Sequence, residues 1–205
     1  MVSGTLVLAC GALAHEITAL QRQTGVAFTL QCLPAILHNT PERIVPELRR
    51  VLDARGGEFA RVLVGYADCG TGGGLDRMLE DYPNATRLPG AHCYDFFGGS
   101  LFHAAMEDEP GTFFLTDYLA RHFDTLVIQG MGLDRRPELM STYFAHYSQL
   151  LYLVQDPSRG FQEKARAAAA TLGLQYSERV VGYGALGAAL AQLQPSRTGA
   201  PALTL

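Results

Sequence analysis

The stretch that decides the fold is residues 62–76, which read Val62-Leu-Val-Gly-Tyr-Ala-Asp-Cys-Gly-Thr-Gly-Gly-Gly-Leu-Asp76. The apolar run Val62–Val64 is typical of a short, buried strand in a parallel sheet. A glycine loop follows, and glycine lets the backbone adopt positive φ and approach a ligand closely. Asp68 and Cys69 stand between strand and loop, at the edge where ligands bind in open α/β sheets. The stretch therefore predicts a strand–loop–helix unit that carries an acid and a thiol.

The same alternation recurs along the whole chain. It predicts an α/β fold with a doubly wound, mostly parallel sheet and helices on both faces, a Rossmann-like three-layer arrangement. Strands are expected at residues 5–9, 26–31, 62–64, 85–88, 126–129, 150–154 and 178–181. Helices are expected at residues 13–23, 41–54, 75–81, 96–106, 113–122, 137–147, 157–172 and 184–193. The 205 residues suffice for a single domain over 1–193, and 194–205 are expected to form a flexible tail.

Composition excludes several classes of function. The net charge is -4 and no patch rich in Lys and Arg is present, so no nucleic-acid partner is expected. No apolar run reaches the roughly 20 residues of a membrane span, and the apolar N-terminus is interpreted as the first strand. The four cysteines, Cys10, Cys32, Cys69 and Cys93, are expected to be reduced in a cytoplasmic protein. The expected partner is a small-molecule substrate.

Three cysteines occupy equivalent places, just past an expected strand. They are Cys10, Cys69 and Cys93, and His92 precedes the last of them. If the strands are neighbours, these groups converge on one edge of the sheet. Thiolates with an imidazole suit tetrahedral zinc, and an open fourth position would make the site catalytic. The pattern predicts zinc, or iron as the alternative, bound by Cys10, Cys69, His92 and Cys93.

Other loops are expected to supply catalytic and binding groups. Asp68, beside Cys69, and His38, after the second strand, are the expected catalytic residues. Backbone N–H groups of the glycine loop and one carboxylate past the 126–129 strand are expected to hold a cofactor or substrate: Gly70, Thr71, Gly72, Gly73 and Asp134. Cys32 precedes Leu33-Pro34 with no glycine nearby, so it is expected to be buried packing.

Two other uses of the thiols remain open. Cys69 at a helix N-terminus could be a nucleophile of an amide hydrolase, with His92 as base and Asp68 or Asp95 orienting the ring. Loop N–H groups would then stabilise an oxyanion. Alternatively, Cys10 and Cys69 could move protons on two faces of a substrate, as in cofactor-free racemases.

Several motifs resemble one family, a bacterial and archaeal domain of unknown function numbered 1638. The motifs cover nearly the whole chain: Leu8-Ala-Cys-Gly-Ala-Leu-Ala14, Leu33-Pro-Ala-Ile-Leu-His-Asn39, Tyr66-Ala-Asp-Cys-Gly-Thr-Gly-Gly73, His92-Cys-Tyr94, Glu109-Pro-Gly-Thr-Phe113 and Gly132-Leu-Asp134. The resemblance implies no established activity. It does imply an association with corrinoid-dependent methyltransferases that act on methylamines and betaines, because members tend to be encoded near them.

Together, residues and resemblance favour a metal-dependent enzyme of one-carbon or methylated-amine metabolism, with methyl transfer as the expected reaction. A corrinoid is a further candidate cofactor, and a corrinoid protein or methyltransferase a candidate partner. The rival interpretation is a non-catalytic accessory protein that binds a metal or a corrinoid. An open coordination position would favour the enzyme, and a closed site with four protein ligands would favour the accessory protein.

Overall fold

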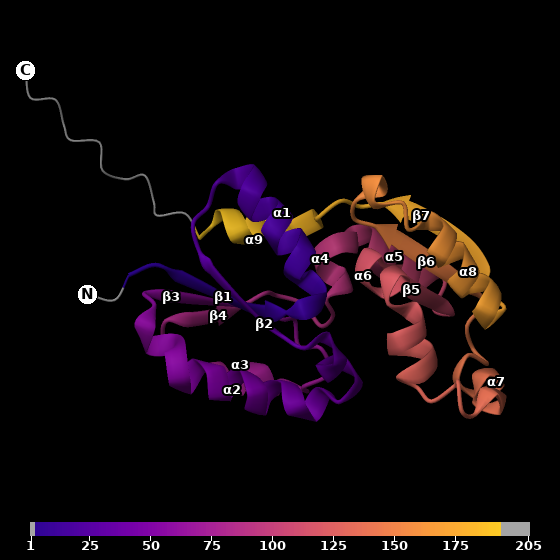
Figure 1. The fold of residues 1–205 in the computed structure, drawn as a ribbon, viewed down its shortest axis with the longest axis horizontal. Helices are drawn as coiled ribbons and strands as arrows, with labels where there is room; N and C mark the ends of the chain where they lie inside the picture. Colours follow the sequence, from indigo (N-terminus) through magenta and orange to yellow (C-terminus); the bar gives the residue numbers. More distant parts are fainter. Residues whose placement is uncertain (1–2, 194–205) are drawn as a thin grey trace, which may run out of the picture.

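The structure is a computed structural model that describes residues 3–193 and contains two parallel sheets (Figure 1). The strands are β1 (Thr5–Cys10), β2 (Thr29–Leu33), β3 (Arg61–Gly65), β4 (Ala85–Arg87), β5 (Thr112–Thr116), β6 (Gln149–Val154) and β7 (Gln175–Val180). The first sheet has the order β2-β1-β3-β4 and the second the order β5-β6-β7. Every pairing within them is parallel. The predicted α/β class is therefore confirmed, with the strands divided between two sheets.

Helices cover the faces of both sheets. They are α1 (Ala14–Thr24), α2 (Ile44–Arg55), α3 (Gly74–Leu79), α4 (Tyr94–Gly98), α5 (Ser100–Asp108), α6 (Asp117–Arg121), α7 (Met140–Tyr143), α8 (Gln162–Leu172) and α9 (Gly184–Ala191). Short 3₁₀ helices lie at Gly11–Leu13 (η1), Ala35–Asn39 (η2), Pro41–Arg43 (η3), Gly56–Glu58 (η4), Pro137–Leu139 (η6) and Pro157–Arg159 (η7). Figure 1 shows α1 and α9 on one side of the first sheet and α2 and α3 on the other. Within residues 3–193, no helix has the length and apolar character needed to cross a membrane.

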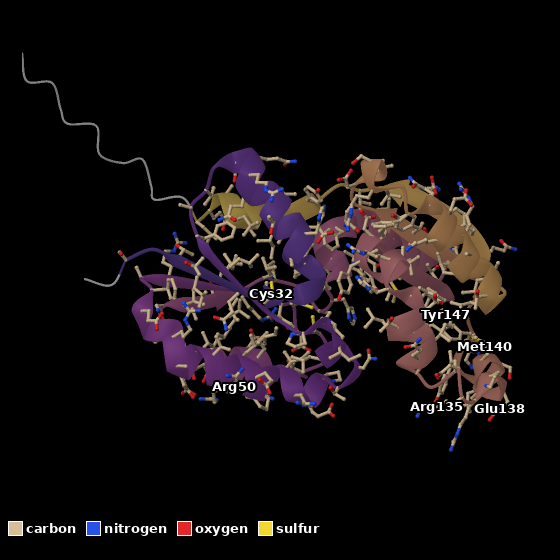
Figure 2. The ribbon with its side chains drawn as sticks, viewed as in Figure 1. Cys32, Arg50, Arg135, Glu138, Met140 and Tyr147 are labelled. Carbon is tan, nitrogen blue, oxygen red and sulfur yellow. The ribbon has the colours of Figure 1, made fainter. Side chains whose placement is uncertain are left out.

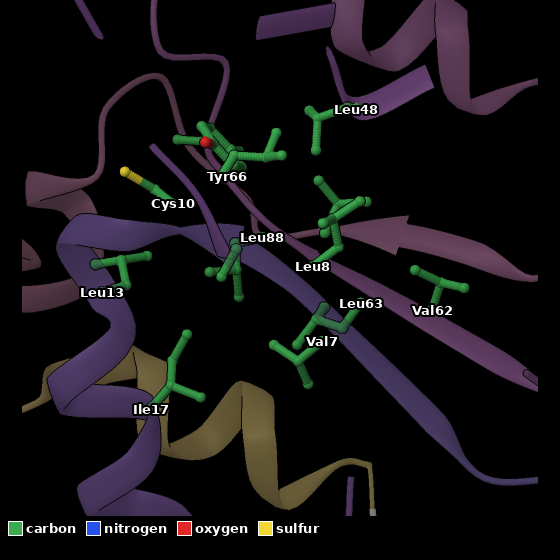
Figure 3. Close-up of a cluster of buried hydrophobic side chains, with 14 of the residues drawn as sticks. Val7, Leu8, Cys10, Leu13, Ile17, Leu48, Val62, Leu63, Tyr66 and Leu88 are labelled. Carbon is green, nitrogen blue, oxygen red and sulfur yellow. The ribbon is translucent and has the colours of Figure 1, made fainter. Parts of the chain in front are cut away.

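The first sheet is built around β1, whose six residues are all buried. A central parallel strand covered on both faces needs a continuous apolar sequence, which Thr5–Cys10 nearly provides. Figure 3 shows Val7 and Leu8 of this strand among side chains from β3 and the flanking helices, with Cys10 at one end. The strand therefore fixes the Cys10 thiol at the carboxyl edge of the sheet.

The second sheet corrects the prediction of a helix over 113–122. Residues 112–116 form β5, and only Asp117–Arg121 is helical. Leu115 packs with α8 in one core cluster, whereas Phe114 packs with Phe102 in another. Successive side chains of a strand point to opposite faces of the sheet, and here both faces are covered.

The predicted strand at 126–129 is also wrong. Asp124–Gln129 is a π-helix (η5) that buries Val127 against the core of the second sheet. A four-residue apolar run has no periodicity that separates a strand from a buried helical turn. The predicted helix at 96–106 is divided into α4 and α5 at Gly99, where φ is 49°. The expected tail at 194–205 lies outside the described residues.

An ionic network joins α1 of the first half to loops of the second. The Arg159 guanidinium lies 3.4 Å from Glu16 of α1 and 3.7 Å from Asp117, which follows β5. Both carboxylates are buried. Asp117 also accepts hydrogen bonds from the Tyr152 hydroxyl at 2.6 Å and from the backbone N–H groups of Gln155 and Asp156. The network thus ties the carboxyl ends of β5 and β6 to α1.

Candidate metal centre

Four side chains with soft or nitrogen donors follow the four strands of the first sheet. Cys10 ends β1, His38 lies in η2 after β2, Cys69 follows β3 and Cys93 follows β4. Because all pairings are parallel, these strands end at the same edge. Each of four consecutive strand–loop connections therefore contributes one candidate ligand to the same place.

Three of these side chains form a compact group. One donor atom each from His38, Cys69 and Cys93 lies within 4.8 Å of the other two. The Cys69 and Cys93 sulfurs are 3.2 Å apart, and the Cys93 sulfur is 3.8 Å from His38 Nε2. The structure thus brings together two of the expected thiol ligands and an imidazole expected to be catalytic.

Cys10 lies on the other side of the His38 ring. Its sulfur is 3.5 Å from His38 Nδ1, whereas Cys93 faces Nε2. The Cys10 sulfur also accepts a hydrogen bond from the backbone N–H of Ala12, at 3.4 Å, and the residue is fully buried. Cys10 therefore contacts the imidazole on its Nδ1 side and is not a member of the three-residue group.

The charges in the cluster are set by mutual hydrogen bonding. The hydrogen bond from Cys93 and the interaction with His38 lower the pKa of Cys69 to about 5, although burial opposes this. The same bond to Cys69, together with burial, raises the pKa of Cys93 well above its ordinary value. Burial lowers the pKa of His38, but Cys10 and Cys69 outweigh it and raise that pKa to about 10. The metal-free cluster thus holds a Cys69 thiolate beside a His38 imidazolium.

Cys69 also has a strained backbone. Its φ is 50°, and among residues 3–193 it is the one non-glycine residue with positive φ. The left-handed region costs an ordinary residue on the order of 1 kcal/mol, and such strain concentrates at functional sites. The backbone N–H of Cys69 donates to the Ala91 carbonyl at 2.9 Å, which links the loop after β3 to the loop after β4. The two loops thus fix the direction of the Cys69 side chain toward Cys93.

The Asp68 carboxylate organises the glycine loop. The Asp68 carboxylate accepts hydrogen bonds from the Thr71 hydroxyl at 2.7 Å and from the N–H groups of Gly72 and Gly73 at 3.0 and 2.7 Å. These bonds lower the pKa of Asp68. The positive φ of Gly70, 83°, completes the turn. The N–H groups of Gly72 and Gly73, expected to bind an anion, are therefore occupied, and Asp68 acts on the loop.

His92 lies apart from the sulfur cluster. It is exposed, and its ring packs edge-on against Phe102 at 6.4 Å between centroids. With Asp95, His103 and Met106 it lines a cavity of about 500 Å³ that includes no member of the cluster. His92 and Cys93 are adjacent residues with side chains on opposite sides of their loop. The imidazole of the cluster is therefore His38 where His92 was expected.

Two other predicted positions also lie elsewhere. Asp134 is exposed and its carboxylate is 3.8 Å from Arg135, which lies at the α7 end of the molecule (Figure 2). It follows η5 in the second half of the chain and not a strand. Cys32 is exposed on the edge strand β2, so the expectation that it is buried is wrong. The edge position of β2 leaves one side of this strand uncovered.

Sequence reasoning missed Tyr66 altogether. This residue follows β3, is fully buried, and stacks on the His38 ring with 6.0 Å between centroids and 13° between planes. Figure 3 shows Tyr66 and Cys10 at the same end of the buried core. The available signal was an aromatic residue in the same post-strand segment as Cys69.

The donor set fits zinc. Two thiolates and one imidazole are common ligands of catalytic zinc, which keeps one further position for water or substrate. Zinc–sulfur bonds of about 2.3 Å in tetrahedral geometry place two sulfurs roughly 3.8 Å apart. The Cys69 and Cys93 sulfurs are 3.2 Å apart, so binding would require them to separate by about 0.6 Å. With Nε2 on the metal, His38 Nδ1 would carry the proton and face the Cys10 sulfur at 3.5 Å, which is the type of contact that orients a metal-binding histidine.

Comparison with known proteins identifies a family. A family model described as a protein of unknown function, DUF1638, matches residues 32–190. The chain belongs to this family. The matched region contains His38, Cys69 and Cys93, whereas Cys10 precedes it. No curated protein and no solved structure matches the chain.

Proposed function

We propose that the protein binds one zinc ion through Cys69, Cys93 and His38 and is a zinc-dependent enzyme. The observation that carries the proposal is the convergence of these three donor atoms within 4.8 Å from three separate strand ends. Buried thiols and an imidazole that meet in this way are more typical of a metal site than of core packing. Core packing alone does not require these side chains to contact one another.

The residues of the chain would have separate tasks at this centre. Cys69 and Cys93 supply negative charge, and His38 supplies Nε2. Cys10 would accept a hydrogen bond from Nδ1–H of His38, 3.5 Å away, and so fix the ring orientation and tautomer. Zinc bound by thiolates supplies Lewis acidity and activates a water or thiol as nucleophile. Asp68 holds the loop that carries Cys69, so its role is positioning.

Methyl transfer in one-carbon or methylated-amine metabolism is the reaction class we put forward. Its support is the family resemblance together with the thiolate-rich donor set, which suits activation of a thiol. A non-catalytic accessory protein that holds a metal or a corrinoid is the rival proposal. A closed site of that kind would require a fourth protein ligand. Cys10, which lies outside the three-residue group beside His38 Nδ1, would have to turn toward the metal to supply it.

A second candidate function is favoured by the backbone and charge of Cys69. A residue with positive φ after a strand and before a helix resembles a nucleophile elbow, and a pKa near 5 makes its thiolate available at neutral pH. His38 would then be the partner imidazole, in place of His92. In this case Cys69 would attack a carbonyl without a metal, as a cysteine-dependent amide hydrolase does.

Elemental analysis of purified variants distinguishes these functions. Cys69→Ser, Cys93→Ser and His38→Ala should each remove most of the zinc, because each deletes a proposed ligand. Cys32→Ser and His92→Ala are matched controls that should retain about one zinc per chain. Wild-type protein that carries no metal, takes up none and remains fully folded would refute the zinc proposal and favour the nucleophile.

A further inference from the structure

The hydroxyl of Tyr66 is a buried polar group without a hydrogen-bond partner. The residue has no exposed surface, and its oxygen has no partner among the described residues. An unpartnered hydroxyl in an interior costs free energy that phenylalanine at the same position would not. Such a group in a native structure indicates a ligand that completes its hydrogen bonding or a strained functional site.

The surroundings of this hydroxyl are those of the metal centre. The Tyr66 ring stacks on the His38 ring, with 6.0 Å between the ring centroids and 13° between the ring planes. The Cys10 sulfur lies near the hydroxyl, but the contact falls outside the distance and angle range of an ordinary hydrogen bond. A tyrosine hydroxyl keeps its proton at neutral pH, so this group is available as a hydrogen-bond donor beside the sulfur cluster.

We propose that Tyr66 donates a hydrogen bond to a small oxygen ligand, a hydroxide or a compact carboxylate, in the coordination position that Cys69, Cys93 and His38 leave open. This inference rests on the proposed zinc site and specifies its ligand. The ligand accepts a hydrogen bond because a neutral phenol donates one. It is small because Tyr66 and Cys10 are fully buried and Cys69 is 9% exposed. The 500 Å³ cavity beside His92 does not include these residues.

The test uses full-length protein loaded with cobalt(II), whose visible absorption reports ligands that enter the open position. Formate is the probe. Tyr66→Phe should keep about one metal per chain and bind formate roughly 10- to 100-fold more weakly, since a hydrogen bond to an anion is lost. Tyr94→Phe is the matched control, because the Tyr94 hydroxyl is partly buried but donates to the Phe114 carbonyl at 3.2 Å. This control should bind formate as wild type does.

Thermal unfolding without formate gives an independent readout. Removing an unpartnered hydroxyl should leave the melting temperature of Tyr66→Phe unchanged or higher, whereas Tyr94→Phe should lower it, since a buried carbonyl loses its donor. A second variant carries a ring-fluorinated tyrosine at position 66, which is a stronger donor and should bind formate more tightly.

The outcomes separate this inference from the zinc proposal. Protein that cannot be loaded with metal refutes both. Metal-loaded protein in which neither variant at position 66 changes formate affinity overturns the role of Tyr66 and leaves the zinc site standing. Weaker binding by Tyr66→Phe together with tighter binding by the fluorinated variant supports the hydrogen bond. Loss of metal in Tyr66→Phe assigns Tyr66 to building the site and contradicts the inference.

Discussion

Replacing Glu16 by glutamine should change how the stability of the protein depends on pH. The Glu16 side chain is 2% exposed, lies 3.4 Å from Arg159 and has one oxygen, Oε2, without a partner among the described residues. Burial raises the pKa of Glu16 from 4.5 to about 7, and the nearby Arg159 only partly opposes the effect. The ionised carboxylate is therefore less stable in the folded chain than in the unfolded chain.

Proton linkage gives the sign and the size of the stability difference between Glu16→Gln and wild type. A carboxyl group with a raised pKa stabilises the folded state fully below its unfolded pKa, and this contribution is lost as pH rises from 4.5 to about 7. Each pKa unit corresponds to about 1.4 kcal/mol, so the loss approaches about 3 kcal/mol at pH 8. Glutamine has no proton to lose. Glu16→Gln should therefore gain up to about 3 kcal/mol over wild type at pH 8, and the gain should shrink toward pH 5.

Urea denaturation at several values between pH 5 and pH 8 measures this difference. Glu163→Gln is the control, because Glu163 pairs with Arg166 while its side chain is 89% exposed, and its difference from wild type should stay flat. A Glu16→Gln protein that is less stable than wild type at pH 8, or that differs from it equally at every pH, would contradict the raised pKa of Glu16. It would show that the pair with Arg159 outweighs the burial of Glu16.

Three further changes test other parts of the site. Cys10→Ala should weaken zinc binding by about 10- to 100-fold and keep one zinc per chain, because it removes the partner of His38 Nδ1; complete loss of zinc would instead make Cys10 a ligand. In native zinc-loaded protein, iodoacetamide should modify the exposed Cys32 first, and mass mapping that finds Cys69 or Cys93 modified earlier would contradict a metal-protected cluster. Gly73→Ala, where φ is 75°, should lower the free energy of unfolding measured in urea by about 1 kcal/mol. Gly57→Ala, with open space around the new methyl group, should lower it less. Equal losses would contradict a need for glycine at position 73.

Much of the site could be predicted from the sequence because it depends on strand ends. Cys10, Cys69 and Cys93 each follow a short apolar run, and parallel strands bring such positions to one edge. The sequence could not show whether His92 or His38 joins the thiols in the candidate metal site. That choice depends on the strand order β2-β1-β3-β4, which places the loop after β2 beside Cys10, and on the direction of a side chain in an irregular loop.

The errors in the fold have a common physical cause. The apolar runs in the segments 113–122 and 126–129, residues 113–115 and 126–128, are short, and such runs suit a strand or a buried helical turn equally. Tertiary packing selects the structure in each case. The strand β5 is covered on both faces, whereas the π-helix η5 buries Val127 on one side. The glycine loop was likewise assigned to a ligand, but Asp68 at its start occupies the same N–H groups.

The most direct test of the account is the zinc X-ray absorption spectrum of the purified protein, with its zinc content. The purified protein should carry about one zinc per chain, bound by two sulfurs at about 2.3 Å, one imidazole nitrogen and one further light atom. Three sulfurs would show that Cys10 closes the site and would support the accessory protein. Fully folded protein that binds no zinc, with a Cys69 thiolate that iodoacetamide modifies first, would contradict the account.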